Sequence, residues 1–425
     1  MRALRGVFVL VALLFAAVAL APHPAAAELK VSISGYVKLD AAFQDQIDTA
    51  GRLRIAPAPS NVAFDEGPGR DPARAEHGQF LFDARQTRVR VGATDEFGDV
   101  RLRGLVEADF FGGSASDDVT STVSNSGVFR LRHAKGEMEI PLGPGHLTVL
   151  AGQWWSGFQN DEITFPNLVD FNGPAGQLFG RHPQVRLTYA IPFGERRELR
   201  LIADAEDQSV NFLDTGRSTP QFNFTTANGP GGPSRQEGQD IPALVGKIQW
   251  LSDVFRAEVA GIASRAKGFA PNGGSGSTFV YGLQGSLNIP IGALTVHLHA
   301  DALHGMNRVA NGDYPDAVFL GPKRGVAAID TVGTYAGLSY KLTKTTTLDA
   351  LYGFRGADPS GVSGFGRGSR GQTDLVRQES IHVNVLQQVF GRVQVGLEYE
   401  RLMIEAFRNN SGSENIYHAA VWFFF

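Results

Sequence analysis

Apolar and polar residues alternate along this chain in segments of about ten residues, the length that a tilted strand needs to cross a bilayer. In residues 29–44 one alternating set is apolar: Leu29, Val31, Ile33, Gly35, Val37, Leu39, Ala41 and Phe43. The other set is mainly polar, and the same pattern returns at 184–191, 294–301 and 393–400. Because successive side chains of a strand point to opposite faces, each segment predicts a strand with one apolar and one wet face.

The connections between the predicted strands are alternately short and long. Tight turns are expected at 141–146, 192–198, 251–254, 290–293, 343–346 and 389–392. Long stretches rich in Gly, Pro, Asn and Asp occupy 46–79, 208–240, 303–330 and 356–379. A soluble β-sandwich would also show alternation, but short turns at one end and long loops at the other are typical of transmembrane barrels.

We therefore predict an all-β fold, a transmembrane antiparallel β-barrel with short periplasmic turns and long extracellular loops. The spacing favours about sixteen strands, with about fourteen or eighteen as alternatives. A membrane also requires the barrel to close, because each unpaired backbone group in hydrocarbon costs several kcal/mol.

Residues 1–27 have the order of a secretory signal peptide. Arg2 and Arg5 precede an apolar run from Val7 to Ala21, and alanines stand at 25–27. This run is shorter than the roughly twenty residues that a membrane-spanning helix needs. We expect cleavage before Glu28, which leaves a single barrel over residues 28–425 in the bacterial outer membrane.

Composition excludes other classes of protein. The chain has no cysteine, which excludes a disulfide framework and a lipoprotein attachment site. Its formal net charge of −4 is mild and does not indicate nucleic acid as a partner.

The end of the chain also alternates, with Tyr417, Ala419, Val421, Phe423 and Phe425 on one face. A terminal aromatic residue on such a strand resembles the signal that outer-membrane barrels present to the β-barrel assembly machinery. We expect Phe425 and Phe423 to form this assembly signal. The alternative, an ordinary amphipathic strand, explains the alternation but not the terminal aromatic residue.

Arginines recur at alternate positions in the predicted strands. They are Arg88 and Arg90, Arg101 and Arg103, Arg130 and Arg132, and, on later strands, Arg186 and Arg200. An arginine that faces lipid at the bilayer midplane costs roughly 2 to 4 kcal/mol, so most of these side chains should face the lumen or lie near a rim. For Arg130 and Arg132 the register stays open, because Ala134, Met138 and Ile140 would place Arg132 on the lipid side.

Two interpretations of these arginines stay open. One is an arginine ladder that attracts anions to the pore wall. The other is structural pairing with wall carboxylates such as Glu107, Asp109 or Glu137, which would cancel the charge. At physiological ionic strength charges are screened over about 8 Å, so wall charges barely reach the axis of a wide barrel. Selectivity therefore requires a constriction.

The stretch from Gln153 to Pro183 is the candidate constriction loop. It carries aromatic residues that we expect to hold it against the inner wall: Trp154, Trp155, Phe158, Phe165 and Phe171. It also carries Asp161, Glu162 and Asp170, which we expect to face the arginines, because opposed charges across a narrowed lumen filter ions by sign. The alternative is an extracellular loop that lies outside the barrel.

Several motifs in the first half of the mature chain occur in the order found in a known family. They are GYVKLDAAFQ (35–44), ARQTRVRVG (84–92), EADFFGG (107–113), FRLRHA (129–134), LAGQWWSGF (150–158), DFNGP (170–174) and RHPQVRLTY (181–189). The chain resembles the DcaP-like outer-membrane porins, and the second half does so only in its barrel pattern. The resemblance implies a homotrimer that takes up small anionic solutes, dicarboxylates among them.

Carried over by position, the resemblance makes Arg88, Arg90, Arg101 and Arg103 wall arginines and 153–183 the constriction loop. The sequence departs from some members in lacking an amino-terminal coiled-coil extension, because Glu28 leads almost at once into a strand. A periplasmic anchoring role is therefore not expected.

Other functions are weaker alternatives. The sequence contains no G-x-S-x-G, no H-E-x-x-H and no P-loop, so a barrel hydrolase has no recognisable nucleophile. His297, His299 and Asp301, with His304 beyond, share a strand face and resemble metal ligands, yet any porin strand places polar residues there. We expect no catalytic residue, no metal and no cofactor. An adhesin or receptor barrel that uses the long loops is the main alternative to a passive diffusion channel for small hydrophilic solutes.

Overall fold

The computed structural model describes most of the chain. The described residues are 29–47, 62–112, 128–160, 167–170, 172–207, 212–213, 237–238, 241–269, 275–310, 314–319, 325–358, 375–407 and 409–425. The predicted signal peptide and the loop residues Asp161 and Glu162 lie outside them.

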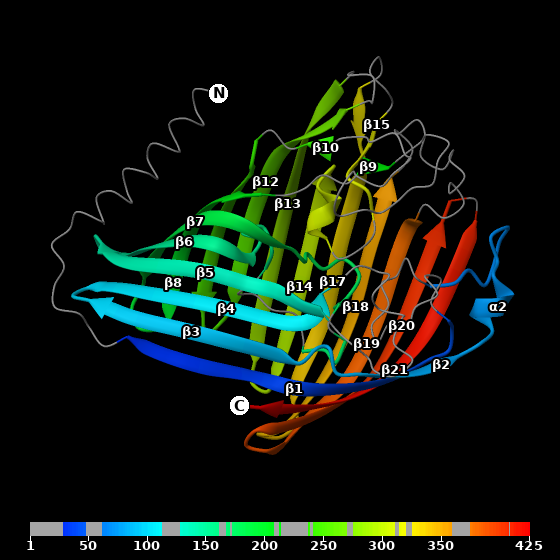
Figure 1. The fold of residues 1–425 in the computed structure, drawn as a ribbon, viewed down its shortest axis with the longest axis horizontal. Coiled ribbons are helices and arrows are strands. Elements are labelled where there is room, and N and C mark those ends of the chain that lie inside the picture. The colour runs from blue at the N-terminus through cyan, green and yellow to red at the C-terminus, as the bar shows by residue number, and fades with distance from the viewer. Residues whose placement is uncertain are drawn as a thin grey trace.

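Within these residues, 16 long antiparallel strands form one closed barrel, as predicted (Figure 1). They are β1 (Lys30–Gln44), β3 (Arg88–Phe97), β4 (Val100–Gly112), β5 (Val128–Leu142), β6 (Gly145–Trp155), β7 (Arg181–Pro192), β8 (Arg197–Glu206), β11 (Ala243–Ser252), β12 (Arg256–Phe269), β13 (Ser275–Ile291), β14 (Leu294–His304), β17 (Asp330–Lys341), β18 (Thr346–Asp358), β19 (Leu375–Phe390), β20 (Val393–Ala406) and β21 (Asn410–Phe424). Each strand pairs with the next, and β21 pairs with β1 from Tyr36↔Phe424 to Gln44↔Ile416, which closes the sheet.

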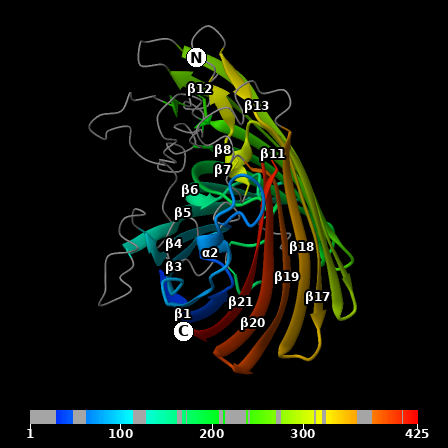
Figure 2. The same ribbon diagram turned by 90° about the vertical axis from the view of Figure 1, so that its right-hand side faces the viewer.

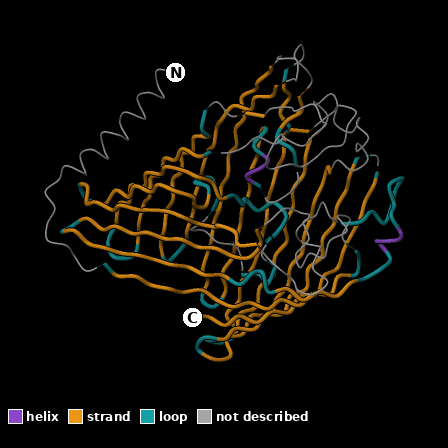
Figure 3. The backbone as a smooth tube through the Cα atoms, viewed as in Figure 1, coloured by secondary structure: helices purple, strands orange, loops and turns teal. Residues whose placement is uncertain are grey.

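Smaller elements lie at the loop end of the barrel. The strand β2 (Gln79–Asp83) pairs with the second half of β1, while β3 pairs with its first half. Short strands β9 (Phe212–Leu213), β15 (Ala317–Phe319) and β16 (Val326–Ala328) form a separate sheet, and β10 (Glu237–Gly238) pairs with β12. Among the residues that the structure describes, two short helical segments, α2 (Pro72–Ala75) and η2 (Asn307–Val309), interrupt a backbone that is otherwise mostly strand (Figure 3). No helix in the described residues is long and apolar enough to cross a membrane.

The predicted alternation of faces is confirmed along the strands. In β1 the side chain of Ile33 is 68% exposed on the outer face, whereas Lys38 is 1% exposed on the inner face. The tight turns fall where the sequence predicts them, for example between Leu142 at the end of β5 and Gly145 at the start of β6. The strands β3–β8 and β17–β21 form different sides of the barrel (Figure 2).

A β-bulge between β4 and β5 settles the open register of the third arginine pair. Glu107 is opposite His133 and Ala108 is opposite Leu131, so Arg132 is the extra residue of β5. The bulge allows Arg132 to turn to the same inner side as Arg130, where it is buried. Simple alternation, counted from Ala134, Met138 and Ile140, placed Arg132 toward lipid. A bulge of one residue reverses the alternation of faces on its two sides, so this count gave the wrong side.

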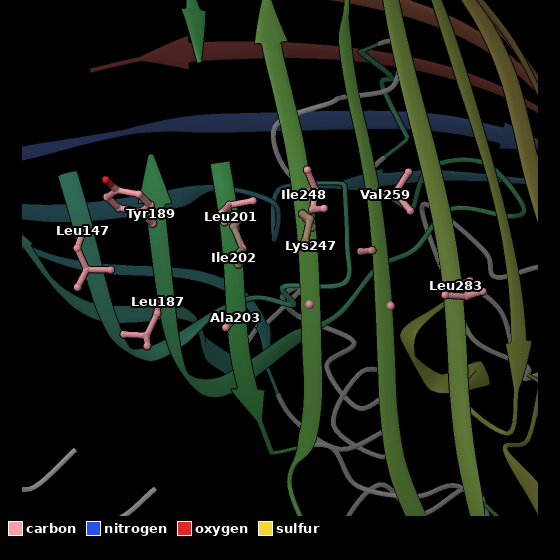
Figure 4. Close-up of a pocket in the computed structure, with 13 residues that line it drawn as sticks. Leu147, Leu187, Tyr189, Leu201, Ile202, Ala203, Lys247, Ile248, Val259 and Leu283 are labelled. Carbon is pink, nitrogen blue, oxygen red and sulfur yellow. The ribbon is translucent and has the colours of Figure 1, made fainter. Parts of the chain in front are cut away.

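The outer surface carries a shallow apolar hollow across β6–β8 and β11–β13 (Figure 4). Leu187, Leu201, Ile248 and Val259 project into it from four of these strands and are exposed to the outside. A surface of this composition suits lipid chains and offers nothing that binds a polar solute. The buried polar and charged side chains lie instead on the inner face of the barrel.

Candidate functional site in the barrel lumen

The wall formed by β3, β4 and β5 carries arginines that share two buried carboxylates. Arg90 and Arg132 both donate to Glu107, each through its Nε at 2.9 Å. Arg132 Nη1 lies 2.9 Å and Arg130 Nη2 2.7 Å from Asp109 Oδ2. The Nε of Arg88 is 3.6 Å from Glu107 Oε1. The pairing that the sequence left open therefore occurs, but four arginines share two acids.

Farther along the same strands, toward the short turns, positive and negative charges balance. Three cations lie among three carboxylates: Arg101, Arg103 and Lys135 beside Glu96, Glu137 and Glu139. These side chains are partly exposed to the lumen, and Arg101 is 48% exposed. Arg101 and Arg103 thus belong to a neutral group, and the arginine excess is confined to the half of the wall nearer the loops.

Arg181, the first residue of β7, adds to this excess and was not singled out from the sequence. Its guanidinium lies over the rings of Trp155 and Phe179, with centroid distances of 5.2 and 5.6 Å. It interacts electrostatically with Arg132, Arg130, Asp109 and Arg88, and its buried Nη1 has no hydrogen-bond partner among the described residues. The only sequence signal was a basic residue near the end of the predicted loop, 153–183.

We call these five arginines the arginine wall: Arg88, Arg90, Arg130, Arg132 and Arg181. Only Glu107 and Asp109 oppose them among the described residues of β3, β4, β5 and β7, which leaves an excess of three positive charges. The other two arginines predicted to line the pore are neutralised by neighbours: Arg186 Nε is 3.0 Å from Asp204 Oδ2, and Arg200 pairs with Glu198.

The segment between β6 and β7 begins later than predicted. Gln153, Trp154 and Trp155 pair with β7 and belong to β6, so Trp154 is a wall residue and not a loop residue. The centroid of its ring lies 3.6 Å from Lys135 Nζ and 4.3 Å from the centroid of the His133 ring, which is tilted by 48°. Strand pairing continues this far because the residues from Arg181 onward form the matching edge of β7.

The first described part of this segment, residues 156–160, turns into the lumen. Ser156 Oγ donates to Glu206 at 2.8 Å on β8, and Lys247 of β11 donates to the Gln159 carbonyl. Phe158 is fully buried in an apolar cluster with residues of β11–β14. Asn160 reaches Tyr335 of β17 through a side-chain hydrogen bond.

The second described part, residues 167–180, lies against the side of the barrel formed by β17–β20 and β1. The side chain of Asn384 donates to the Asn167 carbonyl at 2.7 Å, and Lys38 Nζ donates to the Val169 carbonyl at 3.0 Å. Arg355 Nη2 donates to the Gly176 carbonyl at 3.2 Å. The segment leaves β6, contacts strands on the other side of the barrel and returns to β7, so it crosses the lumen.

Asp170 does not face the arginines as expected. It lies beside Glu400, Glu398, His418 and His382 of β19–β21. Burial of this carboxyl group, reinforced by the negative charge of Glu400, raises the pKa of Asp170 to about 7. The expectation was wrong because this part of the segment docks on β19–β21, which β1 separates from the arginine-bearing strands β3–β5.

The polar residues of β14 that resembled metal ligands are satisfied by protein partners. His299 contacts Ser286 Oγ through Nδ1 at 2.8 Å and Asp301 Oδ2 through Nε2 at 3.1 Å. Asp301 also binds Arg355, and His304 binds Asp330. Both ring nitrogens of His299 are used, so this group offers no open position for a metal ion.

A closed barrel crossed by an inward-folded segment is the architecture of an outer-membrane diffusion channel. Several solved structures share the fold of this chain. The outer-membrane channel DcaP of Acinetobacter baumannii matches with a TM-score of 0.71 at 18% identity, over 93% of this chain and 97% of that one. The anion-selective porin from Comamonas acidovorans matches with a TM-score of 0.54 at 11% identity, over 94% and 100%.

OmpT, an outer-membrane protein of Vibrio cholerae, matches with a TM-score of 0.52 at 12% identity, over 93% of this chain and 98% of that one. No protein-family model and no curated protein matches the sequence. The resemblance to DcaP-like porins that the motifs indicate is thus confirmed at the level of the fold.

Proposed function

We propose that this protein is an outer-membrane porin through which small hydrophilic solutes diffuse passively, with a preference for anions such as dicarboxylates. The observation that carries the proposal is the position of the arginine wall beside a segment that crosses the lumen. Arg181 contacts Trp155 and Phe179 at the two ends of that segment, so the excess charge lies at the narrowed level of the channel.

The excess charge of the arginine wall acts on permeating ions because the crossing segment narrows the channel. In a wide water-filled barrel the excess of three charges would be screened over about 8 Å at physiological ionic strength. A segment that crosses the lumen brings permeating ions closer to the wall than this distance, and the low-dielectric surroundings strengthen the interaction. The neutral group around Arg101 and Arg103 has no such effect, because its charges cancel locally.

Two structurally similar proteins support the proposed anion preference and a trimeric assembly. One structurally similar porin is described as anion-selective, and another similar structure, OmpT of Vibrio cholerae, is described in a trimer form. We propose a homotrimer embedded in outer-membrane lipid, exported through the predicted signal peptide and inserted by the β-barrel assembly machinery. Phe425 exchanges backbone hydrogen bonds of 3.2 Å with Gly35 at the closing seam, which suits a role of the last residue in closure.

The test is the zero-current potential of the purified protein in a planar bilayer across a salt gradient. The wild type should favour anions, and the preference should decline at high salt. Arg181→Gln should reduce the anion-to-cation permeability ratio severalfold without breaking an ion pair. The matched control Arg103→Gln removes the same charge from the neutral group and should change the ratio much less.

Equal effects of the two variants, or a cation preference of the wild type, would refute the role of the arginine wall. An absence of any conductance, together with no swelling of liposomes in sugar solutions, would favour the adhesin or receptor interpretation instead.

A further inference from the structure

A second polar group inside the barrel lies on β19, β20 and β21, which β1 separates from the strands β3–β5 of the arginine wall. His382 is opposite Glu400 in the strand register, and Glu398 is opposite His418. All four side chains face inward and are at most 4% exposed. The four residues therefore form a compact block of two imidazoles and two carboxylates on adjacent strands.

The distances within this block suit a shared cation. His382 Nδ1 lies 3.0 Å from Glu398 Oε1, and His382 Nε2 lies 4.0 Å from Glu400 Oε1. One ligand atom from each of His382, Glu398 and Glu400 can be chosen so that all three lie within 4.8 Å of one another. A common metal ion would require each of these atoms to lie about 2.0 to 2.2 Å from it.

One nitrogen of this block is without a partner. His382 is fully buried, and its Nε2 has no hydrogen-bond partner among the described residues although it points toward Glu400. Buried polar atoms are normally satisfied, so an open imidazole nitrogen beside a carboxylate indicates a position for a bound group. His299 offers the contrast, because both of its nitrogens are bonded to protein.

The block is also rich in buried carboxylates. Glu398 and Glu400 are both buried, and Asp170 lies beside them. Lys38 is already bound to Asp40 at 2.8 Å. Carboxylates taken out of water are normally paired or bound to a metal ion, so this group of oxygen atoms suits a bound cation.

We infer that His382, Glu398 and Glu400 bind a divalent transition-metal ion of the zinc type. An imidazole nitrogen with carboxylate oxygens suits Zn²⁺ better than Mg²⁺ or Ca²⁺, which take oxygen ligands. His418 acts as a positioning residue, because its Nε2 holds Glu400 Oε2 at 3.0 Å. This site is separate from the arginine wall and does not depend on the proposed anion preference.

The site is also linked to the segment that crosses the lumen. Glu398 Oε2 accepts the backbone N–H of Val169 at 2.5 Å and the side-chain amide of Asn384 at 3.2 Å. An ion bound to Glu398 would therefore fix the wall residues on which residues 167–170 dock. Metal binding should reduce movements of the segment that appear as current noise in an open channel.

The inference is tested on the untagged full-length protein in detergent after removal of metals with EDTA. Zn²⁺ is titrated in competition with a chromophoric chelator, and thermal unfolding is followed with and without Zn²⁺. We expect one tight site per chain and an unfolding temperature that rises with Zn²⁺ but not with Mg²⁺. His382→Ala should weaken Zn²⁺ binding more than tenfold and abolish the temperature shift.

Two further variants make the result specific. His418→Gln should weaken Zn²⁺ binding by about 10 to 100-fold, the usual effect of losing a partner that orients a ligand. The matched control is His297→Ala, a buried imidazole on β14 whose nitrogens contact Asn288 and Ser339. It should bind Zn²⁺ like the wild type. Folding of each variant is checked by heat-modifiable mobility on gels.

No tight Zn²⁺ site in the wild type, or equal binding by folded His382→Ala and wild type, would overturn the inference. If His382→Ala fails to fold, Glu400→Gln replaces it, since it keeps the side-chain volume and removes one ligand charge; unchanged Zn²⁺ affinity in this variant would likewise overturn the site. The porin proposal fails separately, through conductance and ion selectivity.

Discussion

Arg355 Nη2 lies 2.7 Å from Asp301 Oδ2, and both side chains are fully buried inside the barrel. The two residues come from β18 and β14, with β17 between them, and Arg355 also donates to Thr331 of β17 at 3.1 Å. The same guanidinium binds the Gly176 carbonyl of the crossing segment. One cation thus joins three wall strands to the segment.

The first prediction concerns this ion pair. Arg355→Met removes the cation and leaves Asp301 buried without its charge partner, which should lower the free energy of unfolding by about 3 to 5 kcal/mol. The double variant Arg355→Met with Asp301→Asn should lose clearly less, because no buried charge is left alone. Denaturant unfolding in detergent measures both. A double variant as unstable as the single one would show that the ion pair itself supplies the stability.

The second prediction concerns the docking of the crossing segment at Gly176. Its φ is +84°, and a Cβ atom there would lie 2.5 Å from the Thr334 carbonyl oxygen and closer still to that of Phe354. Gly176→Ala should therefore push the segment away from β17 and β18 and further into the lumen, which narrows the channel and lowers the single-channel conductance.

The matched control is Gly98→Ala in the turn between β3 and β4. Gly98 also has a positive φ, +59°, but an added Cβ would meet no atom within 4 Å. This variant carries the backbone strain alone, of order 1 kcal/mol, and should leave conductance unchanged. Equal conductance in both variants would mean that Gly176 does not set the width of the channel.

The fold was predictable because its main signal is local. Strand period and turn length are properties of neighbouring residues, so the segment from Leu29 to Phe43 and the turn at 389–392 identify outward faces and hairpin ends directly. The register of Arg132 was not predictable in this way. A bulge depends on how two strands pair, and no residue in 128–142 indicates its position.

The candidate site was predictable only in part. Alternation placed Arg88 and Arg90 inside, but the docking of the crossing segment depends on contacts between residues far apart in the chain, such as Val169 with Glu398. Asp170 was therefore assigned to the wrong wall. The histidine block was not predictable either, because a turn at 389–392 alone would pair His382 with Tyr399, whereas the observed register, with an irregularity between Gln388 and Phe390, pairs it with Glu400.

The third prediction concerns pH and Asp170. This carboxyl group has a pKa of about 7 in the folded protein because of burial and the nearby Glu400, against an ordinary value of about 4 when unfolded. The folded state therefore holds a proton that the unfolded state loses. The resulting stability is complete below about pH 4 and is lost as the pH rises through about 7.

Asp170→Asn removes this titration while keeping the shape of the side chain. Between pH 5 and pH 8, with EDTA present, the unfolding temperature of the wild type should fall more than that of Asp170→Asn. The histidines nearby titrate in both proteins, so the difference isolates Asp170. Parallel pH profiles for the two proteins would contradict the raised pKa.

The last prediction concerns the terminal aromatic residue. Phe425 is 47% exposed on the outer face, and its backbone N–H and carbonyl bind Gly35 of β1. Its ring adds little to the core, so Phe425→Ala should leave the stability of the refolded barrel nearly unchanged. If the ring is read by the assembly machinery, the same variant should insert poorly in cells.

Phe390→Ala is the matched control, because Phe390 at the end of β19 is 72% exposed but lies within the chain. Pulse-chase measurement of heat-modifiable barrel in outer membranes should show a defect for Phe425→Ala alone, and equal defects in both variants would assign the effect to lipid anchoring.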